Sequence, residues 1–221
     1  MIPNSSQAKS SIFSSIRENL AKSKPFDEHG EPSAVISSPV TAAANDVLEV
    51  FRASLDMVGA KCAFVADENE AAARLSALVN ELSAKNVVIS DSDLVYRIVE
   101  ATGIDAVVDP SREELFSSDV GITSAQWAIA ETGTLVLESG AEQHRLISLV
   151  PPVHVCILLG GTIQQSMSEI LKVVDSNANP TITFVTGASR TSDIELTLAI
   201  GVHGPGELYV IVINDQATGK V

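Results

Sequence analysis

The chain has 221 residues, enough for one or two domains with a sizeable core. It carries 28 acidic and 14 basic residues, a formal net charge of -14 at pH 7, and the excess lies after residue 40 because the charges before it balance. A body this acidic repels phosphate backbones and anionic membrane, which excludes nucleic acid as the main partner.

The sequence predicts neither a membrane span nor a secretion signal. Its longest late apolar run, VHVCILL, is far shorter than the roughly 20 residues that cross a bilayer. Cys62 and Cys156 lie far apart and lack C-x-x-C spacing, so alone they build no disulfide framework, zinc site or iron-sulfur site. We therefore expect a cytoplasmic protein whose own chain binds no metal or cofactor.

Residues 1–40 predict a helical arm and a flexible linker. Ile12, Phe13, Ile16 and Leu20 form one apolar stripe at helical spacing. The segment after them is rich in Pro, Ser, Gly and charge, which is typical of an extended linker. The arm either packs on its own domain or contacts a partner subunit, and the sequence leaves both open.

Residues 41–221 predict a single α/β domain, because helical and strand periods alternate along them. After residue 110 the alternation of helical and strand periods stops, and the pattern predicts a strand, a turn and a strand. We therefore expect a small antiparallel excursion here. The expected fold is a Rossmann-like, mostly parallel sheet with helices on both faces and this small excursion. The predicted helices span 45–60, 67–82, 92–102, 162–175 and 192–201, and the predicted strands 62–66, 86–90, 104–109, 153–159, 181–185 and 207–214.

The stretch GASRTSDIEL, 187–196, predicts an anion site, since ligands of open α/β sheets bind beyond the carboxyl ends of the strands. Gly187 permits a sharp turn, Ser189 and Thr191 supply hydroxyls, and a helix starting here would present backbone N–H groups. The guanidinium of Arg190 can hold a carboxylate with two parallel hydrogen bonds. Arg190 is also one of only four basic residues from residue 113 onward.

The same stretch has a second interpretation. Ser192 and Glu195 match the S-x-x-E capping box, in which side chains satisfy the N–H groups of their own helix. Asp193 then suits the first helical turn, although we also keep it as a candidate ligand contact.

Two further polar stretches are candidates. AETGT contains Glu131, Thr132, Gly133 and Thr134, and EQHRL contains His144 beside Arg145. His144, and His203 in the Gly/Pro-rich segment GVHGPGE, can exchange a proton near neutral pH. We take His203, His144 and Glu131 as candidate catalytic residues, although a structural or solvated role is the more frequent one for residues in such turns.

Three motifs together resemble the lactate utilization protein C family, the LUD-domain proteins. They are AETGTLVLES, HRLISLVPPVHVCIL and TGASRTSDIELTLAIGVHGPGELYVIVI, and the match is most specific over 121–213. The chain departs from the family pattern at Ala188, where proline is frequent, and at Gly206, where a basic residue is frequent. Binding of an anion would therefore depend more on Arg145 and Arg190.

The resemblance implies a fold of the sugar-phosphate isomerase and CoA-transferase type. It also implies a subunit that takes part in oxidising L-lactate to pyruvate with companion proteins that hold iron-sulfur clusters. In that hypothesis Arg190 and Arg145 hold the carboxylate, and His203 or His144 accepts the hydroxyl proton. A homo-oligomer stays open.

Two alternatives remain. One is a self-sufficient enzyme, either a sugar-phosphate isomerase or a CoA-transferase with Glu131 as nucleophile. The other is a non-catalytic scaffold whose acidic body and N-terminal arm organise other subunits.

Overall fold

The computed structural model describes residues 5–22, 44–139, 145–174, 181–194, 197–201 and 203–214. The chain divides into two units, 1–39 and 40–221. Within the first unit, helix α1 (Ser5–Lys22) exposes the predicted apolar stripe of Ile12, Phe13, Ile16 and Leu20. The predicted linker lies outside the described residues.

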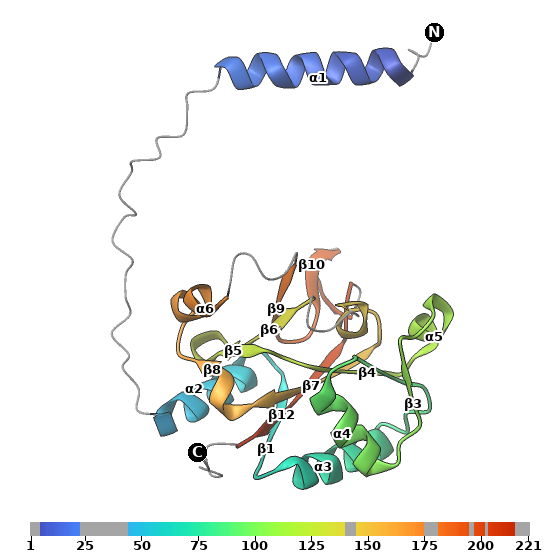
Figure 1. Ribbon diagram of the computed structural model, residues 1–221, viewed down its shortest axis with the longest axis vertical. Coiled ribbons are helices and arrows are strands. Elements are labelled where there is room, and N and C mark those ends of the chain that lie inside the picture. Colours follow the sequence, from blue (N-terminus) through green and yellow to red (C-terminus); the bar gives the residue numbers. More distant parts are fainter. Residues whose placement is uncertain are drawn as a thin grey trace. The chain divides into compact units, whose positions relative to one another are not determined.

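The second unit contains the expected alternation of strands and helices (Figure 1). Its described helices are α2 (Ala44–Met57), α3 (Glu68–Glu81), α4 (Asp93–Thr102), α5 (Arg112–Ser117) and α6 (Met167–Val173), with short 3-10 turns η1 (Ala130–Thr132), η2 (Arg145–Ser148) and η3 (Gly160–Thr162). The described strands are β1 (Lys61–Val65), β2 (Val87–Ile89), β3 (Ala106–Val108), β4 (Val120–Ser124), β5 (Trp127–Ile129), β6 (Thr134–Glu138), β7 (Val153–Leu159), β8 (Ile163–Gln164), β9 (Ile182–Thr186), β10 (Arg190–Ile194), β11 (Thr197–Ile200) and β12 (Glu207–Ile213).

A six-stranded sheet of order β1-β12-β7-β4-β2-β3 forms the centre of this unit, and all its neighbouring strands are parallel. Its central strands β12, β7, β4 and β2 are almost fully buried and largely apolar, as burial from both sides requires. Helices α3 and α4 cover one face through a cluster that includes Leu75, Ile98 and Ile211. This confirms the predicted α/β fold with a mostly parallel sheet.

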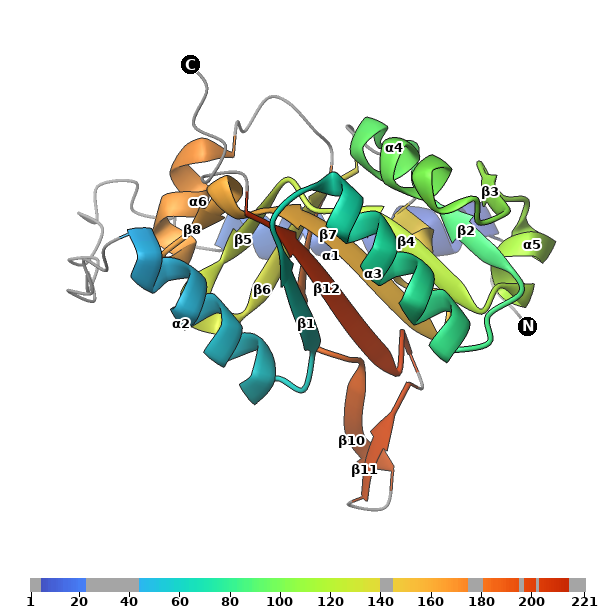
Figure 2. The same cartoon turned by 90° about the horizontal axis from the view of Figure 1, so that it is seen from below.

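The second face is covered by α2 and by a four-stranded sheet of order β8-β5-β6-β9 (Figure 2). Phe51 and Leu55 of α2 are fully buried against Leu158 and Val212 of the large sheet. Helix α6 packs on the outer side of the small sheet through Ile170. The antiparallel excursion is thus a complete second sheet, because β9 pairs with β6 rather than joining the parallel sheet.

Two predicted helices are wrong in extent or type. The segment 162–175 begins as η3 and β8, and only Met167–Val173 is helical. The segment predicted as a helix over 192–201 forms, in its described part, the antiparallel hairpin β10–β11. Helix α5, which begins with a capping box of Ser111 and Glu114, was not predicted.

Candidate functional site

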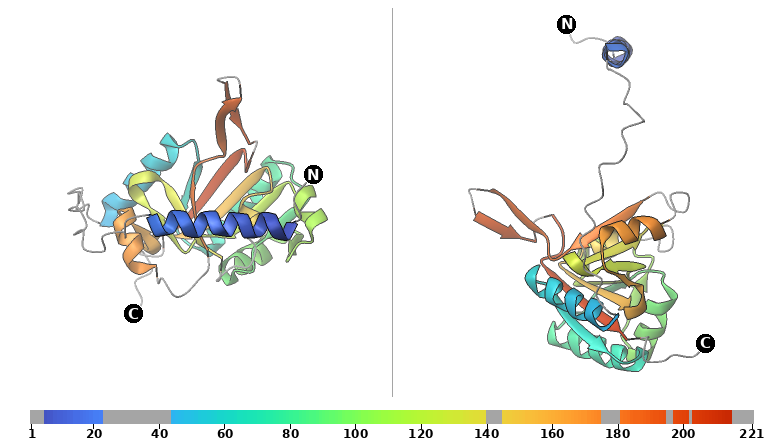
Figure 3. Two further views of the ribbon diagram at one scale, coloured as in Figure 1. Left: turned by 90° about the horizontal axis from the view of Figure 1, so that it is seen from above. Right: turned by 90° about the vertical axis from the view of Figure 1, so that its left-hand side faces the viewer.

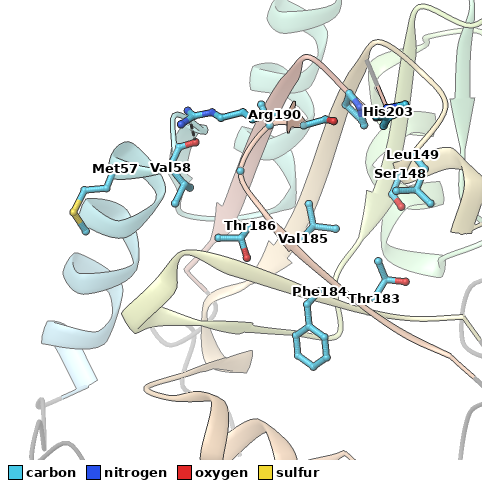
Figure 4. Close-up of a pocket in the computed structure, with 15 residues that line it drawn as sticks. Met57, Val58, Ser148, Leu149, Thr183, Phe184, Val185, Thr186, Arg190 and His203 are labelled. Carbon is cyan, nitrogen blue, oxygen red and sulfur yellow. Dashed lines mark hydrogen bonds between the residues drawn. The ribbon is translucent and has the colours of Figure 1, made fainter. Parts of the chain in front are cut away.

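An open pocket of about 520 Å³ lies between β9, the end of α2, and the turns before β7 and β12 (Figure 4). We call it the amino-edge pocket. The residues that line it are Met57, Val58, Ser148, Leu149, Thr183, Phe184, Val185, Thr186, Gly187, Ala188, Ser189, Arg190, His203, Gly204 and Pro205.

The pocket lies at the amino ends of the parallel strands. The amide of Ser189 donates to the carbonyl of Pro205 (2.8 Å), and the amide of Gly206 donates to the carbonyl of Pro152 (2.9 Å). Pro152 and Gly206 immediately precede β7 and β12. Ser189 and its neighbours directly follow the carboxyl end of β9, as predicted. Since β9 belongs to the second sheet, however, they lie at the amino ends of the parallel sheet and not beyond its carboxyl ends.

The segment after β9 leads into a hairpin rather than a helix. Arg190 pairs with Ile200 and Thr191 with Ala199 in the β10–β11 ladder. Ser192 lies on β10, so the predicted helix start at this residue is wrong, and Glu195, the other half of the predicted capping box, lies outside the described residues. In the described part of this segment no helix N-terminus supplies amides to the pocket. A ligand must be held by side chains and by the backbone of the turn.

Arg190 is the cation of the pocket. Its Nη2 donates to the carbonyl of Val58 at 2.9 Å, and the guanidinium packs against Gly59. Figure 4 shows the side chain extended toward the end of α2. Among the described residues that line the pocket there is no Asp or Glu. No described lining residue therefore competes with a carboxylate ligand for this guanidinium.

Gly187, Ser189 and His203 also line the pocket, as the sequence predicts for a shared site. Gly187 has a φ of 75°, and a Cβ there would approach the carbonyl oxygen of Val58 to 2.6 Å. Glycine thus lets the chain turn closely against α2. His203 is exposed, so its ring is accessible to a ligand.

The AETGT stretch forms η1 and the start of β6, beside the pocket rather than in its lining. The hydroxyls of Thr132, Thr134 and Thr186 are joined by two hydrogen bonds of 2.7 Å each, and Thr186 lines the pocket. Gly133 turns the chain with a φ of 63° against the backbone of α2. A carboxylate oxygen of Glu131 accepts from the amide of Met167 at 3.1 Å, at the start of α6.

The other candidates are less well placed or lie outside the description. Arg145 is exposed at the start of η2 and does not line the pocket, although Ser148 of the same turn does. His144 lies outside the described residues. Thr191 and Asp193 lie on β10, and their side chains are outside the described part of the structure. Every ligand or catalytic role given to these residues stays a prediction.

Sequence reasoning missed the wall formed by Val58, Ser148, Leu149 and residues 183–186 of β9. These residues are apolar or small, and they come together only because β9 crosses to the second sheet. His154 is, as its place in the strand VHVCILL predicts, a hydrogen-bonded core residue: it is fully buried in β7 with its Nε2 2.8 Å from the Thr123 hydroxyl. Burial lowers the pKa of His154 to about 4, so this ring is neutral near pH 7.

The described residues contain no group of three or more His, Cys, Asp or Glu side chains arranged to hold a metal ion. Cys156 is buried in β7, and Cys62 is half-buried in β1, where burial raises its thiol pKa. Among the described helices none is long and apolar enough to cross a bilayer.

The chain belongs to the LUD domain family, whose model matches residues 48–213. It is 31% identical to Lactate utilization protein C of Deinococcus radiodurans, over 96% of this chain and 99% of the relative. It is also 36% identical to an uncharacterized protein of Neisseria meningitidis serogroup B, over 52% of this chain; the match spans 51% of that relative.

A solved structure shares the fold. The crystal structure of a DUF162 family protein from Deinococcus radiodurans matches with a TM-score of 0.63 and 27% identity, covering 78% of this chain and 99% of that one. This neighbour agrees with the expected sugar-phosphate isomerase and CoA-transferase type of fold.

Proposed function

We propose that this chain is the substrate-binding subunit of a lactate-oxidising system and holds the carboxylate of L-lactate in the amino-edge pocket. The names of the relatives support a role in lactate utilization, since several are called Lactate utilization protein C. The family match covers the residues that build the pocket, from the end of α2 to β12.

The observation that carries the proposal is the isolated positive charge of Arg190. The chain has a net charge of -14, yet the described lining of this pocket contains an arginine and no carboxylate. The arginine is also anchored, because one of its five N–H donors is fixed on Val58. An anchored, planar donor fork suits a small carboxylate better than a mobile lysine does.

The chemistry assigns roles to the residues beside it. Oxidation of L-lactate to pyruvate breaks the hydroxyl O–H bond and the C–H bond on the same carbon, and it releases two electrons and two protons. Arg190 holds the carboxylate, the hydroxyl of Ser189 binds it, and the exposed His203 accepts the hydroxyl proton.

The two electrons and the proton of the C–H bond require acceptors beyond this chain. An all-cysteine cluster needs four thiolates, and the chain has two cysteines, on β1 and β7, separated in the sheet by β12. We therefore place the iron-sulfur clusters on companion subunits, and this chain binds and orients the substrate for them.

The test is lactate-dependent reduction of a dye by the purified complex. We expect Arg190→Ala to raise the KM for lactate by roughly 30-fold, the loss of one charge-assisted contact of about 2 kcal/mol. Arg190→Lys should restore part of this loss. The matched control is Arg52→Ala, which removes an exposed arginine that stacks on Phe64, 4.3 Å from the ring centre.

Two outcomes would overturn the proposal. An unchanged KM for lactate in a folded Arg190→Ala complex would show that the pocket does not bind the substrate. A lactate-oxidising complex that contains no iron would contradict the proposal that iron-sulfur clusters on companion subunits accept the electrons.

A further inference from the structure

The amino-edge pocket is much larger than lactate. Its volume of about 520 Å³ lies within the range of roughly 300–1,000 Å³ that is usual for cavities binding drug-sized molecules. The side chain of lactate, by contrast, is a single methyl group. Lactate whose carboxylate is held by Arg190 therefore fills only a small part of the pocket, and the remaining space can take a longer side chain.

The pocket lies at the base of the β10–β11 hairpin, where Arg190 begins β10. The two strands of this hairpin form a sheet of their own and project away from the two larger sheets (Figure 3). Because the described strands project outward, they do not close the pocket over a bound substrate. A substrate longer than lactate is therefore not blocked by the hairpin.

Aliphatic side chains form the walls of this space. Val58, Leu149 and Val185 line the pocket and are each half-buried. Figure 4 shows Val58 beside the guanidinium of Arg190, Leu149 on the opposite side, and Val185 between them in this view. Val58 and Val185 also pack against the core beneath α2, which fixes their positions. A hydrocarbon chain that starts at the carboxylate thus meets apolar walls that the core holds in place.

Two of the hydroxyl groups in the lining are already hydrogen-bonded within the protein. Ser148 donates to the carbonyl of Arg145 at 2.9 Å, and the hydroxyl oxygens of Thr186 and Thr134 lie 2.7 Å apart. A polar substituent of a ligand would have to exchange these bonds for new ones, which contributes little net affinity. The lining therefore favours a hydrocarbon side chain over a more polar one.

We propose that the amino-edge pocket binds L-2-hydroxy acids with unbranched aliphatic side chains of about two to four carbons more tightly than it binds lactate, because apolar contact stabilises each added methylene group. This rests on the proposed function, since it takes the carboxylate to be held by Arg190. The side chain then lies along Val185 and Leu149, and these two residues determine the preferred chain length.

The test is calorimetric titration of the full-length chain with L-lactate and with L-2-hydroxyhexanoate, whose side chain is a butyl group instead of a methyl group. Full burial of a methylene group strengthens binding about fourfold, and coverage of half of it about twofold. For this open pocket we expect L-2-hydroxyhexanoate to bind roughly tenfold more tightly than L-lactate. Arg190→Ala should weaken both acids by the same factor, because both carboxylates occupy the same site.

Val185→Thr replaces one methyl group of the wall by a hydroxyl group of similar size. It should reduce the preference for L-2-hydroxyhexanoate over L-lactate from roughly tenfold to about threefold. The matched control is Val107→Thr, which makes the same change at an exposed position of the edge strand β3, away from the lining of the pocket. This control should keep the full preference.

The contradicting outcomes are distinct. Equal or weaker binding of L-2-hydroxyhexanoate, with L-lactate still bound through Arg190, would overturn the preference for longer side chains and leave the proposed function standing. An undiminished preference in Val185→Thr would overturn the placement of the side chain. If neither acid binds, the proposed function itself is wrong, and this proposal fails with it.

Discussion

The two edges of the six-stranded sheet are built differently. At the carboxyl edge polar side chains bind one another or cap helices: Ser124 donates to Ser92 at 2.9 Å, and Asp67 accepts from two amides of α3. At the amino edge the chain leaves an open pocket, and its arginine is anchored on a backbone carbonyl. The carboxyl edge, where such sheets usually bind ligands, is not fully hydrogen-bonded either, because the buried Ser90 hydroxyl after β2 and the Asn214 side-chain oxygen after β12 have no partner among the described residues.

The difference arises from the second sheet. Strand β9 pairs with β6 in the small sheet and runs past the end of α2, where the chain continues into the β10–β11 hairpin. Strand β9 therefore forms a wall of the pocket next to the amino ends of β7 and β12 (Figure 4). Strand polarity alone would place a ligand at the opposite edge. The location of a site therefore depends on which elements are added around the parallel sheet.

The largest expected effect concerns His154, the second residue of β7 from the amino edge. Its pKa is about 4 in the fold, against about 6.5 in the unfolded chain. The unfolded chain thus binds more protons between these values, and the free energy of unfolding should fall by about 3 kcal/mol as the pH drops from 6.5 to 4. Urea unfolding at several pH values measures this.

His154→Gln keeps a hydrogen-bonding partner for Thr123 but does not titrate, so it should flatten the pH profile in this window. His203→Gln, at an exposed position, should leave the profile unchanged. Equal acid sensitivity of the wild type and His154→Gln would contradict the assignment.

The next effect separates backbone strain from disruption of the pocket. Gly59 and Gly103 have φ values of 75° and 69°, so alanine at either position should cost about 1 kcal/mol of stability. A Cβ at Gly59 meets the guanidinium of Arg190, whereas a Cβ at Gly103 has no atom within 4 Å.

Gly59→Ala should therefore weaken lactate binding by about tenfold, because it misplaces Arg190. Gly103→Ala should lose similar stability with unchanged binding. Calorimetric titration together with thermal unfolding measures both quantities. Equal affinities in the two variants would show that the position of Arg190 does not control binding.

The smallest effect belongs to the carboxyl edge. Asp67→Ala removes the N-cap of α3, whose carboxylate accepts from Asn69 and Glu70 at 2.8 and 2.9 Å. It should cost about 1 kcal/mol of stability and leave lactate binding unchanged, and Asp67→Ser should restore most of the loss. Weakened lactate binding in Asp67→Ala would contradict the placement of the lactate site at the amino edge, because Asp67 lies at the carboxyl edge.

The helices and strands that follow from local periodicity could be predicted, and they specify the fold. The run VHVCILL became β7, and the helix predicted over 45–60 became α2. The hairpin could not be predicted, because Ser192 and Glu195 give a local helix-start signal that ladder pairing between β10 and β11 overrides.

The site was predictable in composition but not in place. The scarcity of basic residues indicated Arg190, and the Gly/Pro-rich segment indicated His203, and both line the pocket. Arg145 gave the same signal and does not line it. Which arginine lies in the pocket depends on the pairing of β9 with β6, a contact between strands far apart in the sequence.

The most direct test of the central claim is calorimetric titration of the full-length chain with L-lactate, comparing Arg190→Ala with Arg145→Ala. We expect Arg145→Ala to bind within about twofold of the wild type, because Arg145 does not line the pocket, and Arg190→Ala to bind roughly 30-fold more weakly. Wild-type affinity in a folded Arg190→Ala chain, or loss of binding only in Arg145→Ala, would contradict the amino-edge pocket as the lactate site.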